Sequence, residues 1–160
     1  MSAKQERLRT EFATALRLAY EVTTATGLLK WKPPSQAAKD PMYSKQTAKL
    51  GSLYESMKEA DIRLRLEGAT EAWSTVADIS HEHYLFRSAL EVLDEQGRSA
   101  DDRQQAREQI MKSALAIAKI AETFHESLAK SLDSLTPPGP APAPSGLRSW
   151  LRGAYGWVRR

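Results

Sequence analysis

The chain contains no cysteine among its 160 residues, so it has neither a disulfide framework nor a thiolate that could act as a nucleophile or metal ligand. It has no run of about 18 apolar residues, and no transmembrane helix is predicted. The first residues, MSAKQERLRTEF, are charged and lack the apolar stretch of a secretory signal. These absences predict a cytoplasmic protein, either free or peripheral to a membrane.

The usual signatures of catalysis are also missing. There is no Gly-x-Ser-x-Gly in a strand-turn-helix context and no glycine-rich phosphate loop. One E-x-x-H motif is present, Glu122 to His125, but di-iron bundles need two copies with further inward carboxylates. We therefore predict a non-enzymatic protein without cofactor or metal, and keep a metal-dependent helical-bundle enzyme centred on His125 as the last alternative.

Two further histidines could suggest a metal site. His81 and His83 are two residues apart on a predicted helix and point in different directions, so they cannot easily share one ion. His83 lies on the apolar stripe of that helix. It is expected to be a core or interface histidine with a hydrogen-bond partner.

Charge is distributed unevenly along the chain. Residues 1–65 carry 12 Lys/Arg and 7 Asp/Glu, a net charge of +5, whereas residues 66–136 carry 7 and 13, a net charge of −6. Residues 137–160 carry four arginines and no acid, a net charge of +4. This asymmetry can steer a partner or pair the protein with itself, and a homodimer through the helical body is one expected assembly.

Residues 1–135 predict an all-α body, because no strand-like alternation competes with helical periodicity. We expect an elongated helical bundle of three to four long helices. The first helix is predicted over residues 3–26, with Ser2 and Gln5 as a capping box and Gly27 as its end. Its apolar face comprises Leu8, Phe12, Ala15, Ala19 and Val22. Residues 27–40 contain Pro33 and Pro34 and predict a loop.

The stretch 41–96 allows two interpretations. Asp40 and Pro41 predict its start as N-cap and first helical residue. Two apolar stripes follow, and they are in phase across Gly68. The shared phase favours one long helix kinked at Gly68. A break there, giving two helices and a compact four-helix bundle, is the alternative, since so long a helix is unusual in a globular domain.

The last long helix is predicted over residues 100–135. Gly97 ends the preceding stretch, and Ser99 with Asp102 resembles a capping box. Its buried face is expected to comprise Ala106, Ile110, Ala114, Ile117, Ala121, Phe124, Leu128 and Leu135.

Residues 136–146, TPPGPAPAPSG, form a predicted linker. Alternating prolines remove N–H donors and favour an extended polyproline geometry, which gives a reach of roughly 30 Å. Such a spacer is useful when the segment after it must stand clear of the body.

That segment, residues 147–160, is a basic amphipathic aromatic tail. At 100° per residue its apolar side chains fall within about 160° of arc, with the arginines on the other side. Fourteen residues with two glycines are marginal as an isolated helix, so the tail is expected to become helical against an apolar surface. The predicted partner-binding residues are Leu147, Arg148, Trp150, Leu151, Arg152, Tyr155, Trp157 and Val158.

Several surfaces would accept this tail. A partner protein groove would take the apolar stripe as spaced anchors, and an anionic membrane surface would take Trp and Tyr at headgroup depth. Nucleic acid, bound by a small accessory protein, is less favoured because the aromatic side chains lie opposite the arginines. The tail could also fold back and complete the core of its own chain. The sequence predicts an adaptor, and it does not name the partner.

Overall fold

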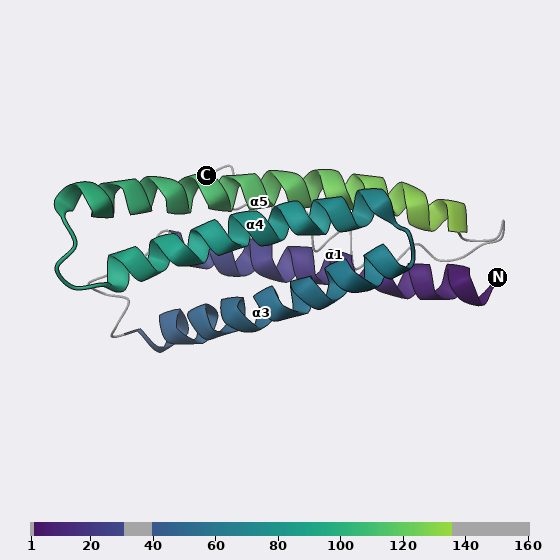
Figure 1. Cartoon of the computed structure of the whole chain (residues 1–160), viewed down its shortest axis with the longest axis horizontal. Helices are drawn as coiled ribbons and strands as arrows, with labels where there is room; N and C mark the ends of the chain where they lie inside the picture. The colour runs from purple at the N-terminus through teal and green to yellow at the C-terminus, as the bar shows by residue number, and fades with distance from the viewer. Residues whose placement is uncertain (1, 31–39, 136–160) are drawn as a thin grey trace.

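A computed structural model describes residues 2–30 and 40–135. Within these ranges it contains four helices and no strand, which confirms the predicted all-α bundle. The helices are α1 (Ala3–Leu29), α3 (Pro41–Leu66), α4 (Thr70–Asp94) and α5 (Ala100–Leu135). They lie roughly parallel to the long axis and form an elongated body (Figure 1).

Successive helices run in opposite directions along the bundle (Figure 1). Helix α1 packs beside α3 and α5, and α4 packs beside the same two helices from the opposite corner. Every neighbouring pair is therefore antiparallel, which is an up-down-up-down arrangement. No described helix combines the length and apolarity that crossing a bilayer requires.

The predicted helix starts are confirmed by their capping contacts. The Gln5 N–H donates to the Ser2 hydroxyl at 3.2 Å, and the Ser2 N–H donates to the Gln5 side-chain oxygen at 2.9 Å. The Met42 N–H donates to the Asp40 carboxylate at 2.9 Å, with Pro41 in the first turn. These bonds satisfy N–H groups that have no partner within the helix.

The first helix is longer than predicted. It continues through Gly27 and ends at Leu29 rather than at Thr26. Ala25 and Leu29 are both buried in the core, one helical turn apart. Burial of this extra turn outweighs the modest preference of glycine against a helix interior.

The favoured prediction of one long helix over 41–96 is wrong, because the chain breaks at Gly68. The Gly68 backbone has a φ of +74°, a left-handed conformation that glycine adopts without strain. The Gly68 N–H donates to the Arg65 carbonyl and the Ala69 N–H to the Leu64 carbonyl, both at 3.0 Å. This pair of bonds is a Schellman motif, which ends α3 and lets the chain reverse.

The two apolar stripes of 41–96 nevertheless both face the core, since an antiparallel helix pair can bury them as well as one helix can. The guanidinium of Arg65 lies 4.1 Å from the centroid of the Trp73 ring and joins the end of α3 to the start of α4. The largest fully buried side chains of the described core are Val22, Leu50, Met57, Leu64, Val76, Ile79, His83, Phe86 and Ile117.

Candidate functional site

All eight predicted partner-binding residues, from Leu147 to Val158, lie outside the described residues, as do the linker 136–146 and Trp31. The described part of the chain ends at Leu135, the last residue of α5.

The E-x-x-H motif lies at the edge of the buried face of α5, as the helical periodicity predicts. Phe124 is buried, whereas Glu122 is exposed and His125 is half-buried. Across 2–30 and 40–135, no group of three or more histidines and carboxylates is arranged to hold a metal ion.

His83 is fully buried on α4, as its place in the apolar stripe predicts. Within the described part of the chain neither ring nitrogen makes a hydrogen bond of good geometry, although the Leu50 backbone lies close enough to favour the protonated ring. Burial, the larger cause, and the positive charge of Arg87 together lower the pKa of His83 from 6.5 to about 4, and an interaction with the Leu50 backbone opposes part of this shift. The imidazole is accordingly neutral at pH 7.

Tyr54 on α3 is the aromatic neighbour of this histidine. Its ring also faces two cations, with the Lys58 ammonium 4.5 Å and the Arg87 guanidinium 5.5 Å from its centroid. Such cation–π contacts contribute about 0.5–1 kcal/mol at exposed sites. Arg87 thus lies against the Tyr54 ring of the neighbouring helix, and its charge also acts on His83.

A cleft of about 890 Å³ lies on the described bundle, and we call it the α3–α4 cleft. It lies where the first half of α3 runs beside the last turns of α4, near the start of α5 (Figure 1). Its walls combine hydroxyl, charged and apolar side chains. They are Tyr43, Ser44, Thr47, Ala48, Gly51, Arg87, Leu93, Asp94, Gln96 and Arg103.

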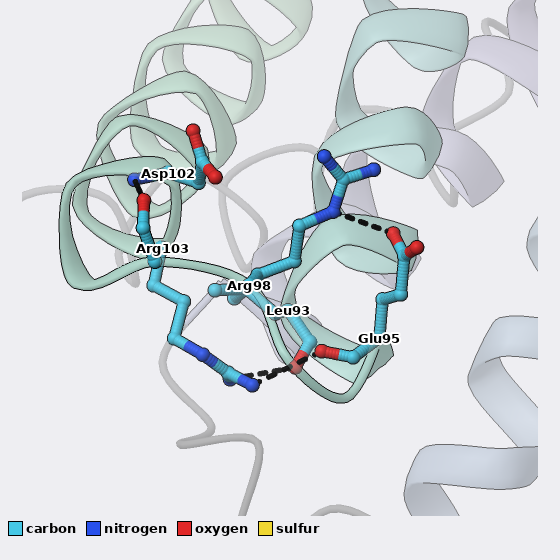
Figure 2. Close-up of polar contacts among 6 residues, drawn as sticks. Leu93, Glu95, Arg98, Asp102 and Arg103 are labelled. Carbon is cyan, nitrogen blue, oxygen red and sulfur yellow. Dashed lines mark hydrogen bonds and ion pairs between the residues drawn. The ribbon is translucent and has the colours of Figure 1, made fainter.

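Arg103 lines this cleft and connects α5 to the end of α4. Its guanidinium donates to the Leu93 and Glu95 carbonyls at the end of α4, both at 3.0 Å (Figure 2). The carbonyls at a helix C-terminus have no partner within the helix, so this side chain satisfies two of them. The Asp102 N–H also donates to the Ser99 hydroxyl at 3.0 Å, which confirms the predicted cap at the start of α5.

Tyr43 and Asp94 face each other from the two helices that line the cleft. Tyr43 is buried, and that burial raises the pKa of its hydroxyl; the nearby Asp94 carboxylate raises it further by its charge and as a hydrogen-bond acceptor. The phenol therefore stays protonated at neutral pH and can donate a hydrogen bond to Asp94.

The sequence did not point to any of the residues that line this cleft, and Arg87 is the one with the most distinctive surroundings. It is half-buried, and among the described residues it forms no ion pair with a carboxylate. A β-carbon placed on Gly51 would lie 3.7 Å from an Arg87 terminal nitrogen, so the guanidinium lies close to the α3 backbone. One sequence signal was available: Arg87 directly follows Phe86 of the apolar stripe, which places this arginine at the edge of the buried face of α4.

Comparisons with protein-family models, curated proteins and solved structures found no match to this chain. No activity, partner or ligand can therefore be carried over from a relative. The function has to be inferred from the bundle, the α3–α4 cleft and the tail sequence.

Proposed function

We propose that the chain is a non-enzymatic interaction protein. The bundle carries the tail 147–160 at the end of the linker 136–146, and the tail docks into an apolar groove of a partner protein. Docking onto an anionic membrane surface is the second candidate, because helical periodicity predicts Trp150, Tyr155 and Trp157 on the side opposite the arginines.

The observation that supports this proposal is a core filled by the four described helices themselves. All four contribute to one cluster of buried apolar residues, and its central side chains are fully inaccessible. The buried face of α5 extends to Leu128, with Leu132 and Leu135 partly buried against the same cluster. A bundle that buries its own apolar stripes leaves a tail rich in tryptophan available for another surface.

The chemistry of the tail fits a docking peptide. Its apolar side chains recur at helical spacing, as in helices that bind a groove through i, i+4 and i+7 anchors. Trp, Tyr and Arg are also the residue types that carry most binding energy at protein interfaces. Because the free peptide is marginal as a helix, binding must also order it, which costs part of the interaction energy.

A capture experiment with three baits tests this function. The baits are the full chain, the chain ending at residue 136, and the full chain with Leu151→Glu, which places a charge in the apolar stripe. A partner retained by the full chain should be lost from both variants, whereas Ser149→Ala on the polar side should keep it. Capture of the same proteins by all baits would refute docking through the tail.

Vesicle flotation separates the two proposed surfaces. Vesicles containing anionic lipid would bind the full chain and release Leu151→Glu if the tail docks on a bilayer. If the tail requires a protein groove, neither the full chain nor its Leu151→Glu variant floats with the vesicles. The two proteins then differ only in whether they capture the partner.

A further inference from the structure

Arg87 lines the α3–α4 cleft and forms no ion pair with any carboxylate of the described residues. We propose that this cleft binds a small organic anion that also carries hydroxyl or amine donors, and that Arg87 is its main contact. The ligand class is a hydroxylated or amino-bearing carboxylate or phosphate ester. This site is independent of the tail and goes beyond the proposed docking function.

The position of Arg87 is the first support for this site. Glu91 lies one turn further along α4, where an exposed ion pair with Arg87 would be expected, yet no such pair forms. The guanidinium is directed instead toward Tyr54 and Gly51 of α3. A half-buried guanidinium that lacks an acceptor keeps N–H donors available, and their planar fork matches a carboxylate or phosphate.

The other positive group of the cleft has a different task. The Arg103 guanidinium already donates to the carbonyls of Leu93 and Glu95, so it adds positive potential to the cleft while its hydrogen bonds hold the start of α5 against the end of α4. The hydroxyl of Thr47 donates to the Tyr43 carbonyl at 2.9 Å, which leaves its oxygen as an acceptor. Ser44, which also lines the cleft, is exposed and supplies a hydroxyl donor toward an anion.

Asp94 narrows the ligand class. Its carboxylate lines the same cleft and repels a ligand that is anionic throughout. A ligand whose acidic group meets Arg87 while a hydroxyl or ammonium group meets Asp94 satisfies both charges. The volume of about 890 Å³ lies within the range usual for small-molecule sites, about 300–1,000 Å³.

His83 provides a built-in reporter of anion binding. The charge of Arg87 helps to lower its pKa, so neutralising that charge with a bound anion should raise the pKa of His83. The histidine is fully buried and does not line the cleft, so its response reports the electrostatic change without a direct ligand contact.

Titration of the full chain with four probes tests the site: glycerate, glycerol 3-phosphate, inorganic phosphate and glycerol. Binding is followed by calorimetry and by NMR shifts of Ser44, Arg87 and His83. Glycerate or glycerol 3-phosphate should bind saturably and more tightly than inorganic phosphate, and neutral glycerol should not bind. Arg87→Gln should weaken binding at least tenfold, equivalent to about 1.4 kcal/mol.

Two further variants complete the test. Arg107→Gln removes an exposed arginine of α5 outside the cleft and should leave binding unchanged. Asp94→Asn should reduce the preference for the hydroxylated probes over inorganic phosphate. Equal affinity of the wild type and Arg87→Gln, with circular dichroism showing both folded, would overturn the proposal. The absence of saturable binding of all four probes to the wild type would overturn it as well.

Discussion

The ring of His83 on α4 meets the ring of Tyr54 on α3 edge-on, with 5.6 Å between the ring centroids and 83° between the ring planes. This contact lies between helices that the chain joins through the turn at Gly68. An edge-to-face pair is favourable, but it does not replace the hydrogen bonds that both histidine nitrogens would make in water.

Replacing this histidine with an apolar residue of similar size should stabilise the bundle. His83→Leu removes two buried nitrogens that make no hydrogen bond of good geometry to the described residues and retains most of the packing, and we expect a gain of about 1 kcal/mol in the free energy of unfolding at pH 7. Urea denaturation measures the change. His81→Leu, at an exposed position of the same helix, is the control and should give no gain. A loss of stability in His83→Leu would mean that the imidazole makes a favourable contact that outweighs its desolvation.

The same residue predicts a pH dependence of stability. Its folded-state pKa of about 4 lies below the usual 6.5, so between these values the unfolded chain binds more protons. Stability should consequently fall as pH decreases from about 6.5 to 4, by about 2–4 kcal/mol in total from this group. Arg87 on α4 is the charged neighbour that adds to the shift, and Tyr54 on α3 is the aromatic one.

Comparing the wild type with His83→Leu isolates this effect from the other titrating groups. Denaturation curves at pH 7, 5.5 and 4 should show the advantage of the variant increasing as pH falls. A constant difference across these pH values would indicate that His83 titrates equally in the folded and unfolded chains.

The reversal between α3 and α4 should depend on glycine. Gly68→Ala has space for the new methyl group, but the positive φ is strained for any residue with a β-carbon. We expect a loss of about 1–2 kcal/mol, measured by thermal or urea unfolding. Gly27→Ala is the matched control, because Gly27 lies within α1 and also has space for a methyl group. That variant should gain up to about 1 kcal/mol, and equal effects at both sites would contradict the account.

Local signals predicted much of this fold. The starts of α1, α3 and α5 follow from capping side chains a few residues away, and the apolar stripes identify the buried faces. The break at Gly68 was not resolved, because one helix and an antiparallel pair bury the same stripes in the same phase. Arg65 and Trp73 hold the turn across two helices. That contact depends on the tertiary arrangement and leaves no periodic signal.

The two candidate sites, the tail and the α3–α4 cleft, also differ in how far the sequence reveals them. The tail is identifiable because its linker and amphipathic pattern are continuous in sequence. The α3–α4 cleft combines residues from three helices, and periodicity does not reveal that Arg87 lies beside Gly51. An arginine four residues before Glu91 ordinarily predicts an exposed ion pair, so its orientation toward α3 appears only in the structure.

Removing the hydrogen bonds of Arg103 between α5 and the end of α4 should destabilise the bundle. Arg103→Met deletes both hydrogen bonds to the carbonyls that end α4, at an expected cost of about 1–2 kcal/mol. The control is Arg98→Met, which removes an exposed pair with Glu95 at 2.6 Å and should cost less than about 1 kcal/mol. Chemical denaturation of the two variants compares these values, and a larger effect at Arg98 would refute a structural role for Arg103.

Deleting residues 137–160 should leave the thermal unfolding temperature nearly unchanged, because α1, α3, α4 and α5 bury their apolar faces against one another. A tail that completed the core would instead contribute burial of its tryptophans, each a large side chain whose loss from a core costs about 3–5 kcal/mol. Calorimetry of the full chain and of residues 1–136 measures the difference. The full chain with Trp150→Ala and Trp157→Ala is the control for chain length, and its thermal unfolding temperature should equal that of the wild type. A shift of about 4 °C or more in either protein would show that the tail packs on its own bundle.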